Sequence, residues 1–297
     1  MQRQMHARLL APGCAFVVLV LAAGVARAET PDLIEVTENK VLRWDIDAPG
    51  TGFVRDVGSG ATLFGDMTRL SDGRIVAYRT TYGGFTPALY EINPETGNAS
   101  LLLQSATGAG EVVAMATMPD GNLFARDNTL GFIRINPATL AWSPVNITGP
   151  YSAANMYSGG MATSPTGQIY AWCDGFATPQ AGVFSKLFRI DPVAGTAQAL
   201  GGFDGLSTSA GMNGMAFTPD GRLFGFTEIN GGQGGELRPN SVYELNLQTG
   251  LATLVAQRDE LRDVRGVVFL PEPGAAAAIL IGVGTLARRR KSVRATW

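Results

Sequence analysis

The chain carries, at residues 213–226, the stretch NGMAFTPDGRLFGF, in which a Pro-Asp-Gly turn joins two short apolar runs. Apolar residues alternate on both sides of a turn that accepts a positive φ, so the stretch predicts a β-hairpin. The same pattern returns as GDMTRLSDGRIVAY from Gly65, VAMATMPDGNLFAR from Val113 and GGMATSPTGQIYAW from Gly159. A fifth copy, RGVVFLPEPG from Arg265, keeps the first strand and lacks the second.

These hairpins recur at a regular spacing, with intervals of 48, 46 and 54 residues between the turns at Asp72, Asp120, Thr166 and Asp220. Each hairpin is followed by a second one, whose turn reads NPETG, NPAT, DPVAG or LQTG. Asn or Asp before Pro suits a type I turn. Four strands in a repeat of roughly 40–50 residues are typical of a β-propeller blade.

The two ends of the body complement each other. We letter the four strands of each repeat a to d in chain order, with strand a innermost. Residues 33–36, 41–46 and 52–57 predict strands b, c and d of a repeat that lacks strand a, and residues 266–270 predict a strand a alone. Pairing them would remove the free edges of an open sheet. We therefore predict an all-β body, a propeller of five four-stranded blades over residues 29–270. The alternatives are a β-sandwich, an irregular multi-sheet body with decaying repeats, or another blade number.

The N-terminal end has the pattern of a secretory signal peptide. It begins with basic residues, continues through an apolar run at residues 15–25 and ends in Ala26-Arg27-Ala28. The apolar run is short against the ~20 residues of a membrane span. We predict export, with cleavage after Ala28.

The C-terminal end joins three parts: Pro271-Glu272-Pro273, the apolar run GAAAAILIGVGTLA, and a basic cluster of Arg288, Arg289, Arg290 and Lys291. In this order they resemble the PEP-CTERM sorting tail of exported bacterial proteins. The resemblance implies a C-terminal transmembrane helix over part of residues 271–297 and an exosortase-type enzyme as processing partner. It also implies localisation to the cell envelope, either membrane-anchored or released to the surface matrix. The run of 14 residues is short for a span, and residues 292–297 extend beyond the basic cluster.

The body itself resembles secreted propellers of the NHL and Tyr-Val-Thr-Asn types, in which turns such as PDG and NPxTG alternate. This likeness covers residues 33–270 and implies a fold rather than an activity.

Composition excludes several functions. All 25 acidic residues lie between residues 29 and 273, against 15 basic ones, so a nucleic-acid partner is not expected. After signal removal the chain keeps Cys173 and no histidine, because its one His is His6. Internal disulfides, His-ligated zinc and Ser-His-Asp or Cys-His catalysis are therefore excluded. Trp44, Trp142 and Trp172 do not form the tryptophan repeats of a quinone-dependent dehydrogenase.

Function is expected where the long loops lie. Loops b–c and d–a share one propeller face and include residues 79–88, 173–186, 227–241, 148–158, 201–213 and 257–265. Binding residues usually lie on long loops of a rigid scaffold. Aromatic, amide and charged side chains that could bind a sugar on this face are Tyr82, Phe85, Tyr151, Tyr157, Asp174, Phe176, Phe203, Asn213, Glu228 and Arg238. Alternatively, the aromatic rings only pack the Gly-rich loops.

Catalytic and metal-binding groups are sparse on the innermost strands. Asp66 begins one such strand, but the equivalent residues are Ala114, Gly160, Gly214 and Gly266. A glycosidase needs a carboxylate pair. Acidic residues near Asp45 and Asp259 lack the density of a calcium loop. A ring formed by Met67, Met115, Met161, Met215 and Val267 is interpreted as core filling rather than a thioether site.

We conclude from the sequence that the chain is an exported propeller acting as a non-catalytic binding or matrix module, with a glycan as candidate ligand. We predict neither a cofactor nor a metal. The alternative is a secreted carboxylate-dependent hydrolase or lyase acting on polysaccharide.

Overall fold

The computed structural model describes residues 33–37, 40–44, 53–56, 63–81, 84–148, 156–176, 183–204, 211–227, 240–257 and 264–270. The predicted signal peptide and all sorting-motif residues lie outside these ranges, so both stay predictions. In the part of the chain so described, no helix has the length and apolarity that crossing a bilayer requires.

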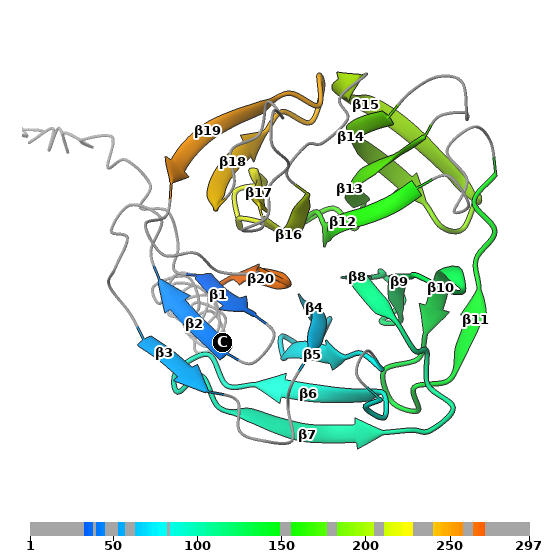
Figure 1. Ribbon diagram of the computed structural model, residues 1–297, viewed down its shortest axis with the longest axis vertical. Coiled ribbons are helices and arrows are strands. Elements are labelled where there is room, and N and C mark those ends of the chain that lie inside the picture. The colour runs from blue at the N-terminus through cyan, green and yellow to red at the C-terminus, as the bar shows by residue number, and fades with distance from the viewer. Residues whose placement is uncertain are drawn as a thin grey trace, which may run out of the picture.

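Five four-stranded antiparallel sheets are arranged around a central axis, which we call the channel, and form five blades, as the repeats predict (Figure 1). Blade I contains β20 (Gly266–Phe269), β1 (Leu33–Val36), β2 (Lys40–Trp44) and β3 (Phe53–Asp56). Blade II contains β4 (Phe64–Arg69), β5 (Ile75–Arg79), β6 (Ala88–Ile92) and β7 (Ala99–Gln104). Blade III contains β8 (Val112–Thr117), β9 (Leu123–Asp127), β10 (Gly131–Ile135) and β11 (Trp142–Pro144).

The last two blades follow the same order from channel to periphery. Blade IV contains β12 (Met156–Thr163), β13 (Ile169–Phe176), β14 (Val183–Asp191) and β15 (Thr196–Asp204). Blade V contains β16 (Met212–Phe217), β17 (Leu223–Thr227), β18 (Ser241–Leu245) and β19 (Ala252–Gln257). Strands β4, β8, β12, β16 and β20 lie nearest the channel (Figure 1).

Blade I closes the ring as predicted. Strand β20 pairs with β1 in antiparallel register, from Leu33 opposite Phe269 to Val36 opposite Gly266. The amide of Arg265 extends this ladder by donating to the carbonyl of Val36 at 2.9 Å. The two termini of the body therefore share one sheet, and the edge of β1 that faces the channel is paired.

The hydrophobic core is divided into five clusters, one between each pair of neighbouring blades. Met67 packs with Val268 and Leu270 between blades II and I. On the other side of β20, Val267 and Phe269 pack against blade V. The remaining three clusters lie between blades II and III, III and IV, and IV and V. Each blade is thus buried on both faces, and its stability depends on both neighbours.

Two expected loops of blade IV are shorter than the sequence predicted. The hairpin of β13 and β14 continues to Phe176 opposite Val183, inside the predicted loop 173–186. Strand β15 continues through Gly201 and Gly202, with φ of 155° and 139°, to Asp204. The register shifts near Leu187, so the glycines accommodate an irregularity in the strand rather than starting a loop.

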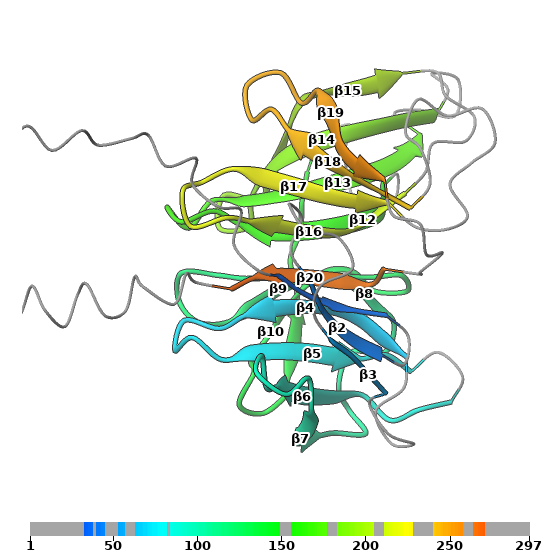
Figure 2. The ribbon, with the colours of Figure 1, turned by 90° about the vertical axis from the view of Figure 1, so that its left-hand side faces the viewer.

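The tight turns between the two innermost strands of the blades lie on one face of the disc. Figure 2 shows the β4–β5 and β16–β17 turns on one side of the molecule. The turn acids stabilise these turns as predicted: the amides of Arg74 and Asn122 donate to Asp72 at 3.1 Å and to Asp120 at 2.9 Å. We call this side the tight-turn face and the other the long-loop face.

Candidate functional site

The innermost strands carry the predicted ring of methionines, and these side chains are core residues. Met67, Met115, Met161 and Met215 are at most 2 % exposed, as is Val267 at the fifth position. Each of the five belongs to a different inter-blade cluster. A flexible, polarisable side chain fills irregular gaps of this kind well. The interpretation of the ring as packing is therefore confirmed.

Asp66 is the acidic residue of this inner ring, and it is buried at 1 % exposure. Its carboxylate accepts the amide of Met67 at 2.6 Å and the amide of Met115, on the next blade, at 2.5 Å. Burial raises the pKa of the Asp66 carboxyl well above its usual value, and the two amide hydrogen bonds oppose this shift without cancelling it. Asp66 therefore joins strands β4 and β8 and is withdrawn from solvent.

The raised pKa of the Asp66 carboxyl predicts that the stability of the protein depends on pH. Its folded-state pKa exceeds the ordinary value of 3.8, so between the two values the folded protein binds more protons than the unfolded chain. Linkage then makes the free energy of unfolding fall as the pH rises through this interval. We expect Asp66→Asn to reduce this part of the slope in Tm measured from pH 4 to pH 9.

Asp72→Asn is the matched control for this measurement. Asp72 is exposed, and its hydrogen bonds to Arg74 lower its pKa, so its stabilising contribution is lost only as the pH falls below the range tested. The substitution should leave the slope between pH 4 and pH 9 unchanged. Equal slopes in the wild-type protein and in Asp66→Asn would contradict the role assigned to Asp66.

The described residues do not provide a carboxylate pair for Asp66 on the inner ring. The equivalent positions are Ala114, Gly160, Gly214 and Gly266, and an added Cβ at Gly266 would lie 2.6 Å from Asp66 Oδ1. Glu111, just before β8, donates its amide to the Asp127 carboxylate at 2.8 Å. Within the described ranges, moreover, no group of three or more His, Cys, Asp or Glu side chains could hold a metal ion.

A cavity of about 260 Å³ lies where the channel meets the tight-turn face. Segments of β4, β12, β16 and β20 line it, together with the turn residues Pro165 and Pro219. Met67, Met161, Met215, Phe217 and Phe269 supply apolar lining, and Thr68, Thr163 and Thr218 supply hydroxyl groups. Arg69 contributes a guanidinium group. We call this cavity the channel mouth.

Sequence reasoning did not single out Arg69, although the repeats contain a signal. Aligning the strands on the methionine ring places Arg69 at the position of Thr117, Thr163, Phe217 and Phe269. One cation at a position that is otherwise neutral is the deviation that an alignment of the repeats can detect. In the structure, Arg69 Nη2 donates to the Phe269 carbonyl at 2.6 Å.

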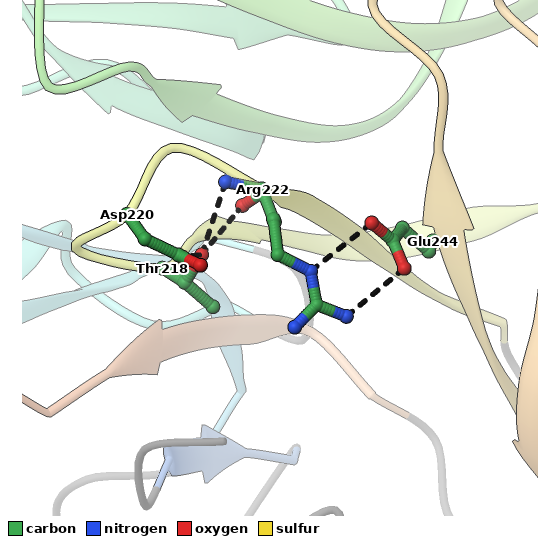
Figure 3. A network of polar contacts seen from close by, with 4 residues as sticks. All are labelled: Thr218, Asp220, Arg222 and Glu244. Carbon is green, nitrogen blue, oxygen red and sulfur yellow. Dashed lines mark hydrogen bonds and ion pairs between the residues drawn. The ribbon is translucent and has the colours of Figure 1, made fainter. Parts of the chain in front are cut away.

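The β16–β17 turn beside the channel mouth is held by its own polar network (Figure 3). The amide of Arg222 donates to Thr218 Oγ1 at 3.0 Å, and the same hydroxyl also contacts the Asp220 carboxylate. The Arg222 guanidinium donates to both oxygens of Glu244, on β18, at 3.1 and 2.9 Å. Arg222 is therefore paired with Glu244 of β18, and Asp220 is bound by the Thr218 hydroxyl.

Four of the ten predicted ligand residues of the long-loop face cannot be placed. Tyr82, Tyr151, Glu228 and Arg238 lie outside the described residues. Phe85 and Asn213 are described and partly buried. The Arg79 guanidinium lies 5.8 Å from the Phe85 ring centroid, so this ring also packs against the protein. Asn213 lies in β16, where the register shifts between Met212 and Gly214.

Blade IV brings three of the remaining predicted residues to paired positions. Tyr157 of β12 pairs with Asp174 of β13, and Asp174 pairs with Ser185 of β14. Ser185 in turn pairs with Phe203 of β15. Phe176 ends β13, opposite Val183. These residues were expected in loops, but they occupy strand positions because the sheet of blade IV extends further. We call Tyr157, Asp174, Ser185 and Phe203 the blade IV row.

No protein-family model and no curated protein matches the chain. Solved structures share its fold at low identity. A Bacteroides thetaiotaomicron protein of unknown function is 17% identical with a TM-score of 0.48, over 81% of this chain and 62% of that one. TolB from Acinetobacter baumannii is 14% identical with a TM-score of 0.45, over 76% and 53%. An auxiliary nutrient binding protein from Bacteroides ovatus is 14% identical with a TM-score of 0.47, over 84% and 61%.

The chain therefore spans less than two thirds of the length of each of these three proteins. Likenesses this distant carry no argument about function.

Proposed function

We propose that this chain is an exported propeller that binds its ligand without chemical conversion, and that a glycan binds on the long-loop face. The observation that carries the non-catalytic part is the inner ring of the propeller. Within the described residues its single carboxylate, Asp66, is buried and hydrogen-bonded to two backbone amides. Glycoside hydrolysis needs two carboxyl groups ~5–10 Å apart on either side of the substrate.

We place the ligand at the end of blade IV where Tyr157, Asp174 and Phe203 lie. The register of blade IV sets two aromatic residues and one acidic residue at successive paired positions of one sheet. Aromatic rings and carboxylates are the groups that stack on sugar rings and accept their hydroxyl protons.

A glycan array tests the binding proposal. We expect the purified protein to bind at least one glycan, and we expect Tyr157→Ala and Phe203→Ala each to weaken that binding tenfold or more, about 1.4 kcal/mol. Trp142→Ala is the matched control, because Trp142 is an exposed aromatic residue on the peripheral strand β11. Unchanged glycan binding by the blade IV variants would show that the ligand binds at another place on the protein. Polysaccharide hydrolysis without stable binding would favour the hydrolase or lyase.

The proposed delivery to the cell envelope rests on the C-terminal tail. Strand β20 ends at Phe269, which lines the channel mouth, so the chain leaves the last blade at the tight-turn face. We propose that an exosortase-type enzyme processes the tail there and that the long-loop face is directed away from the membrane.

Replacing Pro271, Glu272 and Pro273 by alanine tests this delivery in the producing bacterium. We expect the variant to accumulate unprocessed in the membrane fraction, whereas the wild-type protein is processed, as immunoblots of fractionated cells would record. Replacing Pro219 and Asp220 by alanine is the control, because these residues form the equivalent turn of blade V. Normal processing of the tail variant would contradict a sorting role.

A further inference from the structure

We propose that the channel mouth on the tight-turn face is a second binding site, and that it binds a small organic anion through Arg69. The cavity of about 260 Å³ is near the lower end of the sizes typical of small-molecule pockets. It lies at the end of the channel opposite the long-loop face. Because a cavity of this volume is too small for a polymer, the ligand is a small molecule.

Within the part of the chain that the structure describes, Arg69 lacks the carboxylate partner that other arginines of this face have. Arg74 pairs with Asp72 at 2.8 Å, Arg134 pairs with Asp120, and Arg222 pairs with Glu244 at 2.9 Å. Among the described residues Arg69 makes one side-chain hydrogen bond, to the uncharged carbonyl of Phe269. Among the residues that the structure describes, no acidic one lines the cavity.

Two described acids of the elements that line the cavity bind other groups. Asp66 precedes Met67 on the same strand, but its carboxylate accepts the amides of Met67 and Met115. Asp220 contacts the Thr218 hydroxyl. Burial lowers the pKa of the Arg69 guanidinium, because a cation that is partly removed from water is not compensated there by a counter-charge. A bound anion would supply that charge.

The lining fits an anion with an apolar body. The guanidinium has five N–H donors, of which the Phe269 carbonyl accepts one, so a carboxylate or phosphate can bind the others. The hydroxyl groups of Thr68, Thr163 and Thr218 lie on the same lining. The partly exposed Phe217 and the exposed Pro165 and Pro219 offer apolar surface to the carbon skeleton of the ligand.

The structural role of Arg69 does not by itself account for an arginine. Its bond to Phe269 joins blade II to blade I, and Thr163 makes the equivalent bond between blades IV and III, donating to the Thr117 carbonyl at 2.6 Å. A threonine is thus sufficient for such a link in this propeller. The guanidinium adds a charge that the link between blades does not need.

Titration of the wild-type protein with benzoate tests the site, with methionine methyl groups labelled for NMR and assigned by single Met→Leu variants. We expect saturable shifts of the Met67, Met161 and Met215 methyl signals, since these residues line the cavity. Met115 is the internal control: it belongs to the same ring of strands but not to the lining. Benzamide, a neutral analogue of benzoate, should bind at least tenfold more weakly, and phenyl phosphate tests whether phosphate replaces carboxylate.

Arg69→Gln should weaken benzoate binding at least tenfold, while Arg74→Gln, which removes an exposed arginine paired with Asp72, should leave it unchanged. The wild-type titration decides the question even if Arg69→Gln is unstable. Equal binding of benzoate and benzamide, shifts that include Met115 to the same extent, or no shift at 100 mM benzoate would each overturn the proposal. Because the probes and residues differ from those of the glycan experiment, either proposal can fail without the other.

Discussion

A chain that ends at residue 263 is expected to lose the folded state, whereas a chain that ends at residue 270 is expected to keep it. The seven residues that separate the two chains contain β20 (Gly266–Phe269), the strand that closes the ring. Its side chains face two different blades. Val267 and Phe269 are buried against blade V, while Val268 and Leu270 are buried against blade II.

The free energy of unfolding that this truncation removes is expected to be as large as the whole stability of an ordinary domain. Burying an aliphatic or aromatic side chain contributes about 1.5–3 kcal/mol, so these four side chains together contribute roughly 6–12 kcal/mol. Typical domains unfold with about 5–15 kcal/mol. Truncation also leaves the channel-facing edge of β1 unpaired, which favours aggregation.

Circular dichroism and thermal unfolding of the two truncated chains measure this effect. The chain that ends at 270 is the control, because it lacks only the predicted sorting tail. A cooperative transition at the same temperature in both chains would mean that blade I does not need β20. The blades would then be more independent than their shared clusters indicate.

The ring of five blades could be predicted from the sequence, because the strands that close it have recognisable local sequence patterns. Turn residues at Asp72, Asp120 and Asp220 mark the hairpins, and the isolated strand at residues 266–270 has the pattern of strand a in the other repeats. Such signals depend on backbone turns and on alternating burial, and both are properties of neighbouring residues. The strand order of blade I, with β20 beside β1, follows from them.

The candidate sites were harder to predict, because they depend on which strand lies beside which. Arg69 meets the Phe269 carbonyl 200 positions later in the chain, and no local pattern indicates this contact. Gly201 and Gly202 were expected in a loop, yet they continue β15. A pair of glycines looks the same in a loop and in a strand irregularity, and only the register of the neighbouring strand distinguishes the two.

Gly65→Ala is expected to destabilise the propeller by about 3 kcal/mol or more, since it forces two blades apart. Gly65 lies in β4, and an added Cβ would lie 1.8 Å from the Val112 carbonyl oxygen of blade III and 2.5 Å from Thr80 Cγ2. Val112 is part of β8 and is fully buried, so its backbone cannot move without displacing the blade. Overpacking in a well-packed core lowers the free energy of unfolding by ~1–3 kcal/mol. A clash with a backbone atom that cannot move should cost an amount at or above the upper end of this range.

Gly73→Ala is the matched control, because it separates the cost of a steric clash from the cost of backbone strain. Gly73 has a φ of +91° with nothing within 4 Å of an added Cβ, so alanine there causes only backbone strain, roughly 1–2 kcal/mol. Urea unfolding of the two variants should give the larger loss at Gly65. Gly159→Ala, whose Cβ would lie 2.3 Å from the Met212 carbonyl oxygen between blades IV and V, should resemble Gly65→Ala. If Gly65→Ala destabilises the protein no more than Gly73→Ala does, the inner strands are not packed closely enough to require glycine at residue 65.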